Sequence, residues 1–229
     1  MNNTNKINIA IDGPSGAGKS TIAKLLAADF GFIYVDTGAM YRAIGLHILR
    51  KGLTVEDKPA IIDSLKEIEV NIAYVDGAQH IYLNGEDVSG LIRTETVSQY
   101  ASKVSAIPEV RAFLLALQRD LAAKNSVIMD GRDIGTVILP DAEVKIFLTA
   151  ADTARAERRY KELIEKGQDV TMESVLENIR LRDKNDSERA AAPLKPADDA
   201  VLVDTTELDL QQSVEAMKSI IVEKMKHGV

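Results

Sequence analysis

The sequence contains no cysteine and no long hydrophobic run, and it has no excess of positive charge. Without cysteine the chain can form neither disulfides nor thiolate metal sites, and a reducing compartment is permitted but not required. No apolar run approaches the roughly 18 residues that would suggest a membrane span. With 28 Lys and Arg against 35 Asp and Glu, the net charge of -7 gives no general attraction to DNA or RNA, so any anion site must be local.

The rest of the composition is that of a globular protein. The 229 residues are 45% apolar and 28% charged, which allows a sizeable core and favours one elaborated domain over residues 1–229. The segment Met1 to Lys6 is polar and lacks the basic and apolar regions of a signal peptide. We therefore expect a cytoplasmic monomer that binds neither a membrane nor a nucleic-acid polymer.

Short apolar runs alternate with helical patterns along most of the chain. The runs expected to form strands are 7–11, 32–35, 126–129, 144–148 and 201–203. A helix is expected over 20–30, ended by Gly31, and another over about 41–51, after a break at Asp36-Thr37-Gly38. This alternation predicts an α/β protein with a central parallel sheet covered by helices.

The pattern changes to short alternating segments after about residue 63. Two such segments, 69–75 and 80–83, are followed by Asp76-Gly77 and Asn84-Gly85, pairs that favour tight hairpin turns. The sequence therefore predicts a small antiparallel β insert growing out of the parallel core.

A glycine-rich loop follows the first predicted strand. Its sequence, Gly13-Pro14-Ser15-Gly16-Ala17-Gly18-Lys19-Ser20, fits the phosphate-binding pattern G-x-x-x-x-G-K-[ST] in the required strand–loop–helix setting. Its backbone N–H groups are expected to bind the phosphates of ATP, with Lys19 reaching the β and γ phosphates and Ser20 offering its hydroxyl to Mg²⁺. As a loop residue, Lys19 is expected to be exposed.

A second set of positive charges indicates which kind of P-loop protein this is. The chain lacks the guanine-reading N-K-x-D of a signalling GTPase, since Asp183-Lys184-Asn185-Asp186 has the wrong order. Arg42 and Arg132 follow predicted strands, and ligands of open α/β sheets bind at the carboxyl ends of strands. A second phosphate clamp beside the donor loop implies an acceptor that itself carries a phosphate, as in a nucleoside monophosphate kinase.

Four motifs together resemble the bacterial cytidylate kinase family over essentially the full length. They are Gly13 to Thr21, Asp36-Thr37-Gly38-Ala39-Met40-Tyr41-Arg42, Asp130-Gly131-Arg132-Asp133-Ile134-Gly135-Thr136, and Arg182-Asp183 through Arg189-Ala190-Ala191-Ala192-Pro193-Leu194. The resemblance implies Mg²⁺-dependent in-line transfer of the γ-phosphoryl of ATP to CMP or dCMP, giving CDP or dCDP. It also implies a core over about 5–62 and 98–229, a nucleoside-monophosphate-binding insert over about 63–97 and a lid over about 152–170.

The family's site residues carry over onto matching positions. By resemblance, ATP is bound by Gly13 through Thr21. The acceptor phosphate is bound by Arg42, Arg132 and Arg189, the sugar by Arg182 and Asp186, and the base by Ser102, Arg111 and Asp133. Thr37 stands where related sequences often have Ser. Cytosine presents an amino donor at N4, so a carboxylate such as Asp133 can favour it over uracil; the alternative for Asp133 and Asp186 is a capping or salt-bridging role.

Some assignments stay open on the sequence alone. Lys19, Arg132 and a lid arginine are the candidate catalytic residues; among Arg155, Arg158 and Arg159 we choose Arg158, the alternative being a solvated basic helix face. Asp130 or Asp36 could hold a magnesium-bound water, or Asp130 could order its own turn. The rival functions are a kinase for UMP, AMP or shikimate, and a regulatory module that binds nucleotide without turnover.

Overall fold

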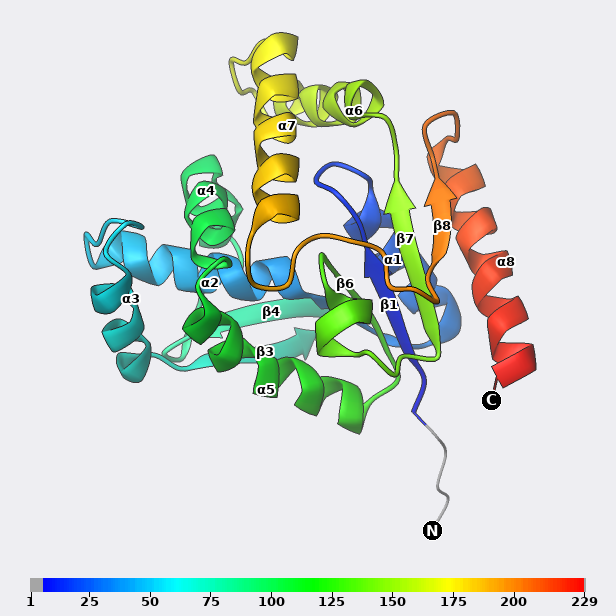
Figure 1. The fold of residues 1–229 in the computed structure, drawn as a ribbon, viewed down its shortest axis with the longest axis horizontal. Helices are drawn as coiled ribbons and strands as arrows, with labels where there is room; N and C mark the ends of the chain where they lie inside the picture. The colour runs from blue at the N-terminus through cyan, green and yellow to red at the C-terminus, as the bar shows by residue number, and fades with distance from the viewer. Residues whose placement is uncertain (1–5, 229) are drawn as a thin grey trace. The chain divides into compact units, whose positions relative to one another are not determined.

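The computed structural model describes residues 6–228, which fall into two compact units (Figure 1). The first unit comprises 6–34 and 122–228, and the second comprises 35–121. Met1 to Asn5 and Val229, which the predicted domain bounds include, lie outside the described residues, as does most of the segment tested for a signal peptide. Within the described part of the chain, no helix is long and apolar enough to cross a membrane.

The first unit is built on a five-stranded sheet. Its order is β2 (Ile33–Asp36), β6 (Val127–Gly131), β1 (Asn8–Asp12), β7 (Val144–Thr149) and β8 (Val201–Asp204), with the last two residues of β2 assigned to the second unit. β1 pairs in parallel with β6 and β7, and β7 pairs in parallel with β8. The predicted parallel sheet is confirmed.

Two helices of the first unit pack on this sheet. α1 (Lys19–Phe30) contacts β6 and α8 (Leu210–Gly228), and α8 contacts β7. Ile11, Leu26, Ile146 and Met217 lie in the shared core and are almost fully buried. Gly31 ends α1 as predicted, in the left-handed conformation at φ 68°.

A second pair of helices follows β7. α6 (Asp152–Glu165) packs against α7 (Met172–Glu188) around a small core of Ala156, Leu163, Val175 and Ile179. A single π-helical turn, η3 (Ile134–Ile138), follows β6. α6 and α7 supply the charged residues that contact the P-loop, Arg155 and Asp183.

The second unit contains the predicted antiparallel insert. β3 (Val70–Val75), β4 (Ala78–Leu83) and β5 (Glu86–Asp87) form a three-stranded antiparallel sheet. Both turns have positive φ at both central residues, 51° and 76° at Asp76-Gly77 and 50° and 81° at Asn84-Gly85. That is the type I′ geometry which such pairs favour, so the hairpin prediction is confirmed.

The helices of the second unit are mostly short. In chain order they are α2 (Thr37–Arg50), α3 (Lys58–Ser64), the 3₁₀ turns η1 (Leu65–Glu67) and η2 (Leu91–Arg93), α4 (Glu95–Val104) and α5 (Pro108–Lys124). The strand ends at Asp36 as expected, but the expected helix start at about 41 is wrong: α2 begins at Thr37, because the Asp36 carboxylate accepts the Ala39 N–H and caps the helix.

Candidate active site

The P-loop connects β1 to α1 in the first unit. Gly13 has φ 151°, and a Cβ added there would lie 1.9 Å from the carbonyl oxygen of Leu148, so only glycine fits. Gly16 and Gly18 also have positive φ, 75° and 87°. The strand–loop–helix arrangement required by the motif is present, with the helix beginning at Lys19.

Lys19 is buried, so the expectation of an exposed loop lysine is wrong. Its Nζ donates to the carbonyl oxygen of Pro14 at 2.7 Å, and only 6% of the residue is exposed. Burial, and after it the charge of Arg132, lower the pKa of Lys19 to about 7, although Asp130, Asp12 and Asp186 oppose the shift. A bound polyphosphate would restore the ammonium charge by adding negative charge beside it.

Ser20 and Asp130 bring oxygen donors together at the end of β6. Ser20 Oγ donates to Asp130 Oδ2 at 2.7 Å, and the Tyr34 hydroxyl donates to Asp130 Oδ1 at 3.1 Å. Hydroxyl and carboxylate oxygens are the hard ligands that Mg²⁺ prefers, so this pair fits the metal expected with ATP. Asp36 lies in the second unit, where its carboxylate caps α2 and pairs with Arg42 and Arg93.

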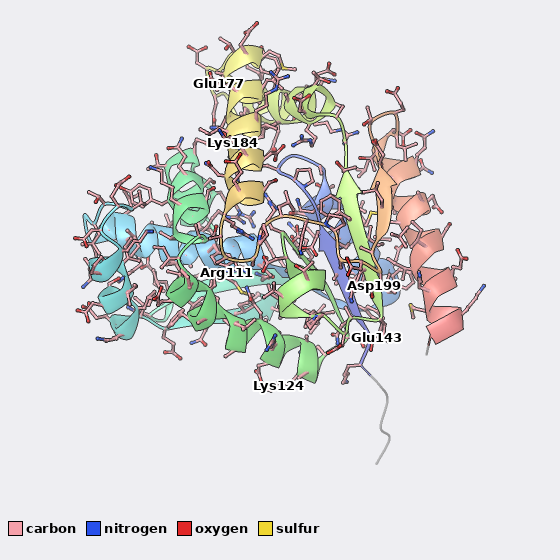
Figure 2. The ribbon with its side chains drawn as sticks, in the orientation of Figure 1. Arg111, Lys124, Glu143, Glu177, Lys184 and Asp199 are labelled. Carbon is pink, nitrogen blue, oxygen red and sulfur yellow. The ribbon has the colours of Figure 1, made fainter. Side chains whose placement is uncertain are left out.

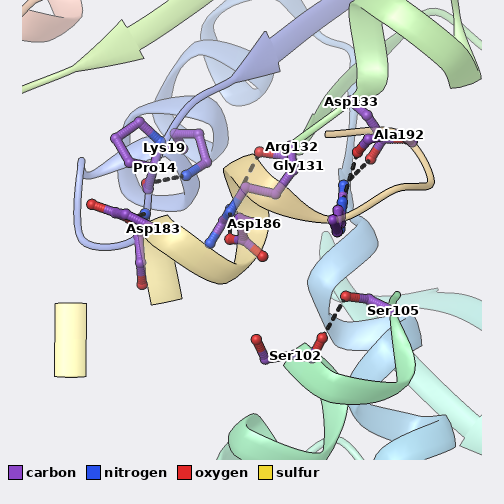
Figure 3. A network of polar contacts seen from close by, with 12 residues as sticks. Pro14, Lys19, Ser102, Ser105, Gly131, Arg132, Asp133, Asp183, Asp186 and Ala192 are labelled. Atoms are coloured by element: carbon purple, nitrogen blue, oxygen red, sulfur yellow. Dashed lines mark hydrogen bonds and ion pairs between the residues drawn. The ribbon is translucent and has the colours of Figure 1, made fainter. Parts of the chain in front are cut away.

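The D-G-R-D segment after β6 carries two charged pairs with residues of the Arg182–Leu194 segment (Figure 3). Arg132 Nε donates to Asp186 Oδ2 at 2.8 Å, and Arg132 Nη1 donates to the Gly131 carbonyl oxygen at 3.2 Å. Burial lowers the pKa of Arg132, but Asp186, together with Asp130 and Asp183, more than offsets this, and the net shift is upward. Asp133 Oδ1 lies 3.3 Å from Arg189 Nη2, and both side chains are 5% exposed.

A buried carboxylate holds the backbone that follows this segment. Asp12, at the end of β1, accepts the N–H groups of Ile134 at 2.7 Å and Gly135 at 2.8 Å. Burial raises the pKa of Asp12 to about 6, although these two N–H groups lower it. Asp12 thus fixes the backbone directly after Arg132 and Asp133.

The candidate lid arginines separate on α6. Arg158 donates to the carbonyl oxygen of Thr205 at 2.5 Å, and Arg159 pairs with Glu162. Arg155 instead reaches the P-loop, where its Nη1 donates to the carbonyl oxygen of Ser15 at 2.9 Å. The choice of Arg158 as the catalytic lid arginine stays a prediction, and it is Arg155 that contacts the donor loop in this structure.

Four predicted site residues, Thr37, Arg42, Ser102 and Arg111, lie in the second unit. Arg42 Nη2 pairs with Asp36 Oδ2 at 2.9 Å, and Thr37 is buried at the start of α2. The Arg111 guanidinium lies 5.8 Å from the ring centroid of Tyr41, the neighbour of Arg42. Arg111 also donates to the carbonyl oxygen of Ser105, whose hydroxyl donates to the carbonyl oxygen of Ser102.

Comparison with known proteins identifies the family to which this chain belongs. The family model described as cytidylate kinase matches residues 9–223. A cytidylate kinase of Caldicellulosiruptor bescii is 50% identical, covering 98% of this chain and 99% of its own, and one of Thermosipho melanesiensis is 51% identical, covering 95% and 98%. The chain belongs to the cytidylate kinase family. It is therefore a nucleoside monophosphate kinase.

A solved structure agrees at the level of the fold. An uncharacterized protein from Eubacterium ventriosum matches with a TM-score of 0.52 at 14% identity, covering 96% of this chain and 99% of that one. The fold prediction of a P-loop kinase with a parallel sheet and a small antiparallel insert is confirmed by the sheet topology and the family membership.

Sequence reasoning missed three side chains that hold the cytidylate kinase site together. Asp12 is read as part of a turn, although it supports the segment after β6. Asp183 lies on α7, whose lower part is marked by Lys184 in Figure 2, and accepts the Ser15 N–H at 3.2 Å. Tyr34 contacts Asp130. The i,i+3 spacing of Asp183 and Asp186 is the one signal that places both on one helix face.

Proposed function

We propose that this cytidylate kinase transfers the γ-phosphoryl group of ATP to CMP and dCMP, giving CDP and dCDP, and that it acts as a monomer. The observation that carries the proposal is within the first unit: the P-loop with Lys19 follows β1, and Arg132 follows β6, the strand that pairs with β1. Phosphoryl transfer needs positioned positive charge more than covalent chemistry.

The donor role is supported by the P-loop geometry. Its backbone N–H groups and Lys19 are proposed to bind the ATP phosphates, with Ser20 and Asp130 holding Mg²⁺. The metal would neutralise charge on the β and γ phosphates. Because Lys19 is buried, its ammonium would act in a site of low dielectric, where its attraction to phosphate is strong.

The acceptor role is supported by the paired arginines. Asp186 and Asp133 neutralise Arg132 and Arg189 in this structure, as buried charges require. We propose that Arg132 and Arg189 bind the CMP phosphate, that Arg182 and Asp186 contact the sugar, and that Asp133 accepts the N4 amino group. The roles of Thr37, Arg42, Ser102 and Arg111 in acceptor binding rest on the resemblance of their motifs.

An ADP-release assay across the common nucleoside monophosphates tests reaction and acceptor together. We expect turnover with CMP and dCMP to exceed that with UMP, AMP and GMP, and shikimate to be inert because it lacks a phosphate. A preference for UMP or AMP would contradict the proposed acceptor. ATP turnover that does not rise with any monophosphate would favour the regulatory module.

A further inference from the structure

The main chain of Ser15 in the P-loop is held by an ion pair between the two helices that follow β7. Asp183 Oδ1, on α7, accepts the Ser15 N–H at 3.2 Å. Arg155 Nη1, on α6, donates to the Ser15 carbonyl oxygen at 2.9 Å. The two side chains also form an ion pair with each other, with Arg155 Nη1 2.6 Å from Asp183 Oδ2. Both polar groups of one peptide residue are therefore bound by a single neutral pair.

The packing around this pair is tight. The Arg155 side chain is 7% exposed, and its Nε donates to the carbonyl oxygen of Ala150 at 2.8 Å. A Cβ added at Gly16 would lie 3.3 Å from the Arg155 Cβ, so α6 lies directly against the loop. Arg155 has three acceptors in fixed directions, which suits a planar guanidinium and not a single ammonium.

Ser15 lies in a loop that contains three glycines with positive φ. Gly13 and Gly16, on either side of the Pro14-Ser15 pair, have positive φ, and glycine loses the most conformational entropy when it is fixed. A loop that is already fixed does not lose that entropy again when ligand binds. The contacts at Ser15 therefore lower the entropic cost of forming the donor site.

We propose that Arg155 and Asp183 are positioning residues for the donor nucleotide, acting through the Ser15 peptide and not by contact with the transferred phosphoryl. The inference rests on the proposed function for the identity of the donor, ATP. The Arg155–Asp183 pair carries no net charge. Removing Arg155 therefore leaves the negative charge of Asp183 uncompensated beside the P-loop, where it repels the phosphates of the nucleotide.

The chain offers a matched control. Arg180 Nε and Asp152 Oδ2, 2.7 Å apart, also join α7 to α6, but they are 60% and 34% exposed and hold no P-loop atom in the structure. Arg180→Met therefore removes an Arg–Asp bridge between the same helices without changing the contacts at Ser15. Any effect that comes only from joining α6 to α7 appears in both variants.

The test measures binding of ATP by calorimetry without acceptor, and then KM and kcat with CMP. We expect Arg155→Met to raise the Kd and KM for ATP about tenfold or more, with the KM for CMP changed less than about threefold. Arg155→Met/Asp183→Asn should recover at least half of this loss on a logarithmic scale, because the repelling carboxylate is gone. Arg180→Met should stay within about twofold of the wild type.

Three results would overturn the proposal. An equal loss in Arg180→Met would assign the effect to helix packing. A fall in kcat with unchanged ATP Kd would make Arg155 a direct contact of the reacting phosphoryl. An ATP Kd in the double variant as high as that in Arg155→Met would show that repulsion by Asp183 does not cause the loss. If Arg155→Met does not fold, Arg155→Lys keeps the charge and should show an intermediate loss; no loss would contradict the three-acceptor role.

Failure of this inference is distinguishable from failure of the proposed function. ATP binding is measured without any acceptor, so a wild-type protein that binds ATP but does not phosphorylate CMP contradicts only the acceptor assignment. Normal CMP phosphorylation with an ATP Kd insensitive to Arg155 contradicts only the positioning role.

Discussion

Charged side chains around the P-loop are buried and balanced, and this balance sets their protonation. Lys19 lies among Arg132, Asp130, Asp12 and Asp186, and its pKa is lowered to about 7 because burial outweighs the attraction of the carboxylates. A pKa of about 7 leaves the lysine largely neutral at pH 8 unless a neighbouring anion raises that pKa. Nucleotide binding must therefore be coupled to its protonation.

We predict that binding of ADP takes up a proton at Lys19, and that the uptake grows from pH 6.5 to pH 8.5. The free enzyme loses the Lys19 proton over this range, whereas the bound phosphates hold it, so uptake approaches about one proton at the upper end. Calorimetry in buffers of different ionisation enthalpy measures it. Proton uptake by Asp12 would instead decrease from pH 6.5 to pH 8.5, because a group with a pKa of about 6 binds fewer protons as the pH rises above that value. Uptake that is absent at pH 8.5, or unchanged in Lys19→Ala at saturating ADP, would contradict the assignment.

We predict that Asp133→Asn lowers the efficiency with CMP and narrows the ratio between CMP and UMP. Loss of a charge-assisted contact costs about 1.5–3 kcal/mol, or roughly 10- to 150-fold. Asn is preferred to Ala because Asp133 also faces the buried Arg189 at 3.3 Å. Steady-state kinetics with both acceptors check it, and Arg132→Ala should depress both while leaving their ratio nearly unchanged. If Asp133→Asn lowers the catalytic efficiency with CMP and with UMP by the same factor, Asp133 supports the structure of the site and does not discriminate between the two bases.

At the scale of elements, the loop between β1 and α1 is fixed by backbone contact. The Gly13 Cα faces the carbonyl oxygen of Leu148 on β7, and Gly31 at the end of α1 has positive φ but open space where a Cβ would stand. Both glycines have positive φ, 151° at Gly13 and 68° at Gly31, but only at Gly13 does an atom stand in the way of a Cβ. Gly31→Ala therefore serves as a reference for a positive-φ substitution without a steric contact.

We predict that Gly13→Ala destabilises the protein by about 3 kcal/mol or more and abolishes turnover, because a Cβ 1.9 Å from a β7 carbonyl forces backbone to move. Gly31→Ala should cost only about 1 kcal/mol, the strain of a left-handed alanine. Urea unfolding of both variants gives the comparison. Similar losses in the two variants would mean that conformational strain, and not the contact with Leu148, decides.

At the scale of the whole molecule, Asp12 links stability to pH. Burial raises its pKa from 3.8 to about 6, so between these values the folded protein binds a proton that the unfolded chain does not. The contribution of Asp12 to the free energy of unfolding therefore falls as pH rises from about 4 to about 6, and it levels off above 6. At neutral pH the ionised carboxylate costs about 3 kcal/mol relative to the acid form.

We predict that the difference in unfolding free energy between wild type and Asp12→Asn shifts by about 2.4 kcal/mol against the wild type between pH 4 and pH 7. Asn does not titrate, so the variant removes this one contribution while the other carboxylates titrate in both proteins. Urea unfolding at four pH values measures the difference. A difference that does not change with pH would show that Asp12 has an ordinary pKa in the folded state.

The sequence by itself determined the α/β class, the P-loop, the two hairpin turns and the family, because each depends on residue type at fixed local spacing. It placed Lys19 in an exposed loop and started α2 too late, because burial and the Asp36 cap depend on neighbours that spacing does not reveal. Only the tertiary structure placed Asp12 under the D-G-R-D segment and Arg155 with Asp183 on Ser15. These contacts join residues more than 100 positions apart in sequence or on separate helices, and folding alone brings their charges within bonding distance.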